Sequence, residues 1–171
     1  MDAIEVLVDA FGRARSDVTR AVDGLTADEL NWRPDADANP VAWLVWHLTR
    51  VQDDHVADLA GTEQVYTADG WARRFDLPFD EASIGFGHTS EQVASVRVDD
   101  PALLVGYHDA VHERTVAYLR TLGDADLDEV IDDAWDPPVT RGVRLFSVVD
   151  DDIQHAGQAA YLAGLARRRR S

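Results

Sequence analysis

From Val143 to Ala166 the chain reads VRLFSVVDDDIQHAGQAAYLAGLA. Positions three and four residues apart along this segment fall on common faces of a helix. Small side chains recur through its second half, and they let the backbones of neighbouring helices approach closely. These small residues are Ala156, Gly157, Ala159, Ala160, Ala163 and Gly164. The segment is therefore expected to be a long helix in the interior of a helical bundle.

Three further segments carry apolar residues at helical spacing. They span about residues 2–23, 40–61 and 101–122. Asn39 is placed to cap the second of them and Pro40 to begin it, since the first turn of a helix leaves its N–H groups unpaired. Four such helices predict an all-α fold, a four-helix bundle that forms one domain over residues 1–171.

The connections between these helices are unequal, and two are long. Residues 62–90 are expected to be mostly loop, with one short helix near Asp69–Phe75. A loop of this length lets the helices on either side of it run parallel, by a crossover. Alternatively, it covers one end of the bundle as a lid or a pocket wall. A second irregular stretch, which includes Trp135–Pro138, leads into the last helix.

The composition narrows the classes of function. The absence of cysteine excludes disulfides, thiolate metal ligands and a cysteine nucleophile. A net charge of −16 repels phosphate backbones and anionic lipids, so neither a nucleic acid nor a membrane is expected as a partner. Without a membrane-length apolar run or a basic, apolar leader, a cytoplasmic protein is expected. The run Arg167–Arg170 is expected at the negative end of the last helix, with a binding tail as the alternative.

One face of the last predicted helix is apolar at both ends and polar in its middle. In order it reads Val148, Asp151, His155, Gln158, Leu162 and Leu165. Burying an acid, an imidazole and an amide without partners costs several kcal/mol, so the pattern needs an explanation. Asp151 and His155 have the i, i+4 spacing at which two side chains of one helix can hold one ion.

His47, in the second predicted helix, supplies a third candidate ligand. Leu44, Leu48 and Val51 flank it, so it joins or borders the apolar face. It lies about 12 Å from the start of its helix, and His155 is near the middle of its own helix, so the two can meet at similar depth. Two imidazoles and a carboxylate from facing helices, with one position left for water, are typical of a catalytic zinc-type site.

Two alternative interpretations of these residues require no metal. A histidine on an apolar face is often a hydrogen-bonded core residue. Asp151 could belong to a solvated acidic start of the last helix, because Asp150 and Asp152 flank it and acids suit the first turns of a helix.

The other histidines are expected outside the site. His108 and His112 are assigned to a solvated face, since charged residues surround them. His55 is expected to be packed or partly exposed, and His88 to be a loop residue, with contact to a pocket as its alternative. Asp54 lies about 10 Å beyond His47 along the same face, which is too far for ligation but leaves a role as substrate contact or proton acceptor; a surface acid is the plainer interpretation.

Two blocks of sequence resemble a known family. They read Asn39-Pro40-Val41-Ala42-Trp43-Leu44-Val45-Trp46-His47-Leu48 and Asp151-Asp152-Ile153-Gln154-His155-Ala156-Gly157-Gln158. They resemble the DinB-like superfamily of metalloenzymes, in particular its mycothiol-dependent, maleylpyruvate isomerase-like branch. The resemblance implies a four-helix bundle with a crossover between its second and third helices. It also implies a metal held by His47, Asp151 and His155, although many members have histidine, and the mycothiol branch often glutamate, where this chain has Asp151.

The sequence thus leads to the hypothesis of a metal-dependent S-transferase that uses a low-molecular-weight thiol, mycothiol first among them, on an electrophilic small molecule. Zinc is the expected ion and nickel the alternative; Gln158 and Asp54 are the candidate contacts to ligands or substrate. Two other classes remain: a non-catalytic helical module that dimerises or sequesters a small molecule, and a metal-assisted hydrolase. A homodimer is compatible with each of them.

Overall fold

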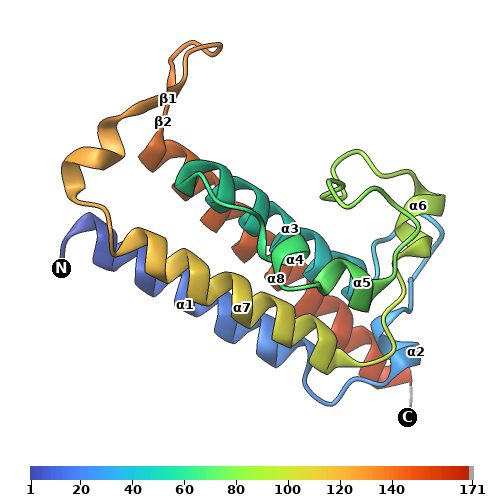
Figure 1. The fold of residues 1–171 in the computed structure, drawn as a ribbon. Coiled ribbons are helices and arrows are strands. Elements are labelled where there is room, and N and C mark those ends of the chain that lie inside the picture. The colour runs from blue at the N-terminus through green and yellow to red at the C-terminus, as the bar shows by residue number, and fades with distance from the viewer. Residues whose placement is uncertain (170–171) are drawn as a thin grey trace.

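A computed structural model describes residues 1–169 and confirms the all-α fold. Four long helices form the bundle (Figure 1). They are α1 (Ala3–Val22), α3 (Val41–Ala60), α7 (Pro101–Leu119) and α8 (Arg141–Arg169). Each lies within about three residues of its predicted ends, which is the usual uncertainty of a helix boundary read from sequence.

Short elements occupy the connections. They are α2 (Ala27–Leu30), α4 (Val65–Ala68), α5 (Trp71–Phe75), α6 (Ser90–Ser95), the 3-10 helix η1 (Asp124–Asp128) and the strands β1 (Val130–Asp132) and β2 (Val139–Thr140). Helix α5 confirms the predicted short helix. The antiparallel pair β1–β2, with Val130 opposite Thr140, was not predicted and projects beyond the start of α8 (Figure 1).

The residues at the cap positions explain where α1 and α3 begin, and one of the sequence predictions for these caps is wrong. Asp2 accepts a hydrogen bond from the Glu5 amide and so caps α1. The prediction that Asn39 caps the second helix is wrong: Pro40 takes the cap position, and no side chain caps α3. Pro40 has an extended ψ of 161° there, and its carbonyl accepts the first helical bond from Leu44. Its missing N–H is needed neither in the cap nor in the first turn.

Helices α3 and α7 run parallel, which confirms the crossover. Thr49 contacts His108, Gln52 donates to Thr115, and the Leu59 carbonyl accepts from Tyr118, so residue numbers rise together along both helices. The connection between them, residues 61–100, carries α4, α5 and α6 across the molecule.

Helices α3 and α8 run antiparallel and pack side by side (Figure 1). His47 lies beside His155, and His55 lies beside Arg144, so the numbers on α8 fall as those on α3 rise. This pairing decides which side chains of the two helices share a level of the bundle.

Helix α3 is the most enclosed element, with fifteen of its twenty residues buried. Helices α7 and α8 cover two of its sides, and the loop after α5 covers a third, because Arg50 and His47 both contact that loop. Its polar side chains must therefore find partners inside the protein.

The interpretation of His108 as a residue on a solvated face is wrong. His108 is only 1% exposed, and its Nδ1 lies 3.1 Å from the Thr49 hydroxyl. Its helical neighbours, one turn away in each direction, are the buried Leu104 and Val111. The charged Asp109, adjacent only in sequence, turns away to pair with Arg15 of α1. His112 is half-buried.

The basic end of α8 contacts the rest of the bundle. Arg167 donates hydrogen bonds to the Ala21 and Asp23 carbonyls at the end of α1, where a helix leaves its carbonyl groups unpaired. Arg169 lies over the ring of Trp32, 4.5 Å from its centroid. Arg170, the last residue of the predicted basic run, lies outside the described residues.

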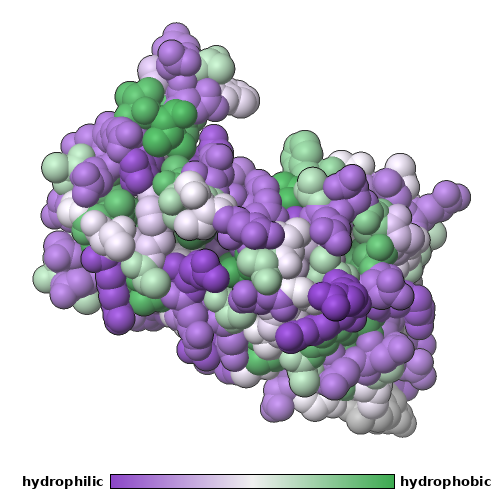
Figure 2. All heavy atoms as spheres, viewed as in Figure 1, coloured by the Kyte–Doolittle hydropathy of each residue, from purple (hydrophilic) through white to green (hydrophobic). Residues whose placement is uncertain are grey.

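Polar side chains cover most of the face seen in Figure 2, and apolar ones appear as separate patches. The outline is indented between the β1–β2 hairpin and the loop that precedes α6 (Figures 1 and 2). None of the helices formed by residues 1–169 combines the length and apolarity needed to cross a bilayer.

Candidate metal centre

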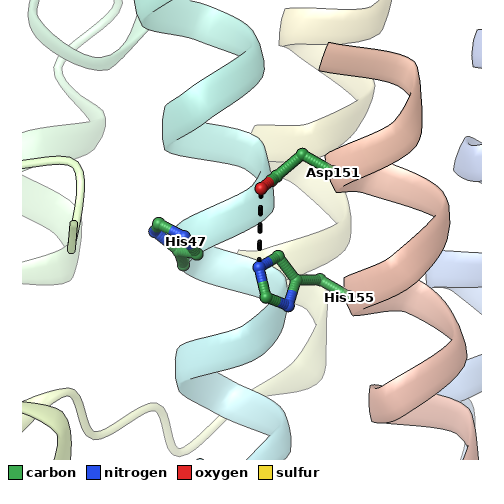
Figure 3. A group of neighbouring side chains, drawn as sticks. All are labelled: His47, Asp151 and His155. Atoms are coloured by element: carbon green, nitrogen blue, oxygen red, sulfur yellow. Dashed lines mark ion pairs between the residues drawn. The ribbon is translucent and has the colours of Figure 1, made fainter. Parts of the chain in front are cut away.

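The structure brings His47, Asp151 and His155 together between α3 and α8. One ligand atom from each of the three lies within 4.8 Å of those of the other two. Figure 3 shows His47 on α3 and the two α8 residues one turn apart, with both α8 side chains directed toward α3. Asp151 Oδ1 lies 3.5 Å from His155 Nε2. The aspartate side chain, although one methylene shorter than glutamate, thus reaches the cluster.

The cluster is enclosed but reachable. His47 is 6% exposed, and the side chains of Asp151 and His155 are 29% and 19% exposed. The plainer interpretation of Asp151, a solvated acid at the start of the last helix, does not fit, because α8 begins at Arg141 and Asp151 is well inside it. The fully buried residue is its neighbour Asp152.

Both imidazoles have their Nδ1 atom occupied by an oxygen that can only accept. His47 Nδ1 donates to the Ile84 carbonyl at 2.5 Å, and His155 Nδ1 donates to the Gln158 amide oxygen at 2.8 Å. In the neutral form of each ring the proton is therefore on Nδ1, and the lone pair is on Nε2. This is the tautomer and the outer contact found in metal-ligating histidines.

The charge state also suits a cation. Burial is the main influence on His47 and lowers the pKa of its imidazole, which keeps the ring neutral. Asp151 Oδ2 is buried and has no hydrogen-bond partner among residues 1–169. An unpartnered buried carboxylate oxygen is costly unless a proton or a cation satisfies it. Two Nε2 lone pairs and this oxygen form a donor set that fits a divalent metal.

Trp43 forms an aromatic wall beside the cluster. Its ring stacks on His47 at 4.5 Å between centroids and meets the edge of His155 at 6.3 Å. Its Nε1 donates to His88 Nδ1 at 3.3 Å. His88, expected as a plain loop residue, therefore lies in contact with the wall, and its Nε2 is 3.1 Å from the Ser83 hydroxyl.

The loop of residues 76–89 lies directly against the cluster, and Gly85 makes this possible. Its φ is +90°, and a Cβ atom there would stand 2.8 Å from His47 Nδ1 and 3.0 Å from the Trp46 ring. Only glycine has both the freedom to adopt this φ and the space for such an approach. The close approach brings the neighbouring Ile84 carbonyl onto the imidazole.

Arg50 holds this loop on α3. Its buried guanidinium donates to the Glu81 carbonyl at 2.8 Å and to the Ser83 carbonyl at 3.2 Å. It lies 4.1 Å over the Tyr66 ring, and its charge is balanced by Asp53 at 3.6 Å. Arg50 therefore fixes the segment whose next carbonyl orients His47.

A pocket of about 370 Å³ opens beside the cluster. His47 and Asp151 form part of its wall, and Val51, Val148 and Arg144 line it further along the two helices. This volume is within the range of small-molecule sites. The cluster thus has a route to a ligand that is larger than water.

The remaining predicted residues take different positions. Gln158 contacts His155 as described, although its own surface is exposed. Asp54 lies outside the cluster and accepts a hydrogen bond from Gln64 at 2.7 Å. His55 is half-buried beside Arg144.

Sequence reasoning missed Ile84, Gly85, Arg50 and Trp43. The carbonyl of Ile84 gives no signal, because every residue has one. Gly85 in the run Gly-Phe-Gly-His and an arginine within the enclosed helix α3 were usable signals. Trp43 precedes His47 by one turn, so their stacking was predictable from the helix.

Comparison with known proteins agrees with this architecture. The sequence profile described as the DinB superfamily matches residues 10–159. A solved structure, described as the crystal structure of the conserved protein of locus from Enterococcus faecalis, is 32% identical; the alignment covers 97% of this chain and 98% of that one, with a TM-score of 0.91. No curated protein matches. On the profile match and this full-length likeness, the chain belongs to the DinB superfamily.

Proposed function

We propose that the protein is a metal-dependent S-transferase that joins a low-molecular-weight thiol, mycothiol first among the candidates, to an electrophilic small molecule. One observation carries the proposal: two imidazoles with their lone pairs on Nε2 and an unpartnered carboxylate oxygen converge at the edge of a pocket. Three protein ligands and an open side are typical of catalytic rather than structural metal sites.

His47, Asp151 and His155 would hold the ion, with zinc favoured by two nitrogens and one oxygen and nickel as the alternative. A divalent ion bound there lowers the pKa of a thiol and so supplies a thiolate near neutral pH. The chain itself has no cysteine, so the thiol must come from a second molecule.

The residues around the ligands would position and shield the reaction. Ile84 and Gln158 fix the two ring planes, while Trp43 and the loop of residues 76–89 exclude water from one side. In the transfer, the thiol proton leaves to solvent and the sulfur forms a bond to carbon. The leaving group departs with the electron pair of the bond that it gives up.

Metal analysis and a conjugation assay test the proposal together. Untagged protein should retain about one equivalent of metal, and monochlorobimane should be consumed only when metal and thiol are both present. His155→Ala should abolish both properties, whereas His112→Gln, on another helix, should preserve them.

Three results would contradict the proposal in different ways. Metal below about a tenth of an equivalent, unchanged by His155→Ala, would favour the non-catalytic helical module. Metal-dependent turnover of p-nitrophenyl acetate with no thiol requirement would favour the hydrolase. Thiol conjugation that survives removal of the metal would show that the cluster is not the reactive site.

A further inference from the structure

We propose that the pocket beside the metal centre is built for an electrophilic substrate that carries a carboxylate, and that Arg144 binds this group. The inference rests on the proposed function, because it names the chemical class of the molecule that reaches the same site. It assigns a role to one end of the pocket that the metal ligands do not explain.

The pocket has two chemically different ends joined by an apolar stretch. His47 and Asp151 lie at one end, Arg144 lies toward the other, and Val51 and Val148 are between them along α3 and α8. An elongated molecule with an apolar middle and a polar group at each end matches this order. Pockets of this kind use few polar groups, and those groups decide the orientation of the ligand.

Arg144 is held in place and still accessible. Its Nη1 donates to His55 Nδ1 at 3.3 Å, its Nη2 lies 3.7 Å from Asp132, and its side chain is 23% exposed. These two contacts leave other N–H groups of the guanidinium, which has five. A fixed guanidinium is well suited to bind a carboxylate through two parallel hydrogen bonds.

Arg144 is the cation at this end of the pocket, where His55 and several acids surround it, among them Asp132 and Asp54, whose Oδ2 lies 3.9 Å from His55 Nδ1. His55 does not add an opposing negative charge, and burial together with Arg144 lowers the pKa of its ring, which keeps it neutral. With Nδ1 accepting from Arg144, its proton is on Nε2. Asp132 offsets part of the arginine charge, and Asp151 belongs to the metal end of the pocket.

The spacing of α8 sets the length of the ligand. Arg144 and Asp151 are seven positions apart, which corresponds to about 10 Å along a helix. A probe thiol that occupies both ends, with its sulfur at the metal and its carboxylate at Arg144, therefore needs a linker of about six to eight carbon atoms, judged from that rise. Shorter mercapto acids cannot span both ends.

Thiol binding to the cobalt-loaded protein tests this inference, because the sulfur-to-cobalt absorption band reports binding without any turnover. The probes are 3-mercaptopropionate, 6-mercaptohexanoate, 8-mercaptooctanoate and the matched alcohols 6-mercaptohexanol and 8-mercaptooctanol. The longer acids are expected to bind at least about tenfold more tightly than their alcohols, which is the usual scale of a charge-assisted contact. The short acid should show no such advantage over 2-mercaptoethanol.

Variants of Arg144 make the test specific. Arg144→Gln should remove the preference for the acids and leave the affinity for the alcohols unchanged, and Arg144→Lys should restore part of the preference. Arg13→Gln removes a cation from the exposed face of α1 and should change nothing. Unchanged alcohol binding by Arg144→Gln also shows that this variant is folded.

The outcomes separate this inference from the proposed function. Equal binding of acids and alcohols, with the absorption band present, would overturn the role of Arg144 and leave the thiol chemistry intact. Absence of the band with every thiol would contradict the proposed function. In that case, calorimetry of octanoate with the metal-free protein decides the inference: binding that Arg144→Gln abolishes would support an anion site, and no binding would overturn it.

Discussion

Gly85 lies so close to His47 that a Cβ atom at position 85 would stand only 2.8 Å from the Nδ1 atom of the His47 imidazole. The loop therefore contributes to the His47–Asp151–His155 cluster through its backbone. We predict that Gly85→Ala lowers the affinity for Zn²⁺ at least about tenfold, the scale of losing an outer contact to a ligand. It should also reduce the free energy of unfolding by about 1–3 kcal/mol, because alanine is strained at a φ of +90°.

Gly87 supplies the matched control for that change. Its φ is +73°, and no atom of the described chain lies within 4 Å of the position that a Cβ would take. Gly87→Ala should therefore show a similar loss of stability with no change in the dissociation constant for Zn²⁺, measured by competition with a chromogenic chelator. Equal losses of metal affinity in the two variants would mean that general strain in the loop, and not contact with His47, is responsible.

Gln158 should affect the affinity for Zn²⁺ and leave the stability of the fold nearly unchanged. Gln158→Ala removes the oxygen that accepts from His155 Nδ1, which should weaken Zn²⁺ binding about 10- to 100-fold. The exposed position of Gln158 predicts a melting temperature close to that of the parent. Gln154→Ala is the control, since Gln154 is exposed on the same helix and its side chain donates to Asp150, whereas Gln158 contacts His155. Identical metal titrations of both variants would rule out an orienting role.

Arg50 should be important for stability, because its removal affects both the buried ion pair with Asp53 and the loop of residues 76–89. Arg50→Met leaves Asp53 without its cation in the interior, a change that costs about 3–5 kcal/mol in comparable buried pairs. It also releases the carbonyls of Glu81 and Ser83. Chemical unfolding measures the first effect, and hydrogen exchange over residues 76–89 measures the second.

The double variant Arg50→Met/Asp53→Asn separates these two effects. Asparagine removes the unpaired charge, but its NH2 group replaces an oxygen that accepts from Val65 or from Tyr66 and Tyr107, so only a small part of the stability should return. The loop should remain as exchangeable as in Arg50→Met. Full protection of the loop in the double variant would disprove that Arg50 holds it.

His108 should make stability fall with decreasing pH. Burial lowers the pKa of its ring to about 3, whereas the unfolded chain has a histidine pKa of about 6.5. Between these values the unfolded state takes up a proton that the folded state does not, so stability decreases as the pH falls, by about 1.4 kcal/mol per pH unit. His108→Gln should remove this contribution, which is measured as the difference in urea midpoints between the variant and the parent from pH 7 to pH 4.5.

His112 provides the comparison on the same helix. It is half-buried, and burial also lowers the pKa of its ring, so His112→Gln should change the pH dependence by a smaller amount than His108→Gln, whose ring is fully buried. If His112→Gln changed the pH dependence of stability more than His108→Gln, the buried ring of His108 would be taking up its proton in the folded state.

The helices and the two facing histidines were predictable because their signals are periodic. Apolar spacing located α1, α3, α7 and α8, and the i, i+4 relation of Asp151 and His155 follows from helix geometry alone. The same reasoning failed for His108, whose charged sequence neighbour Asp109 was given more weight than its buried helical neighbours. The error is instructive, since only residues one turn away share the environment of a helical side chain.

The loop over the site was not predictable in its detail. Ile84, Glu81 and Ser83 act through backbone carbonyls, whose positions depend on the path of the chain and not on residue identity. The role of Arg50 depends on the same path. Sequence patterns specify which side of a helix is buried, but they contain little information on which irregular segment covers it.

The distribution of the three candidate ligands over α3 and α8, which are far apart in the chain, has a consequence for the biogenesis of the protein. His47 leaves the ribosome early, whereas Asp151 and His155 emerge only after the whole crossover and α7 have been synthesised. If the cluster is a metal centre, the nascent chain cannot load its ion during most of translation. Metallation is then a late, post-translational event, and the cellular supply of the ion at that moment determines which metal the protein acquires.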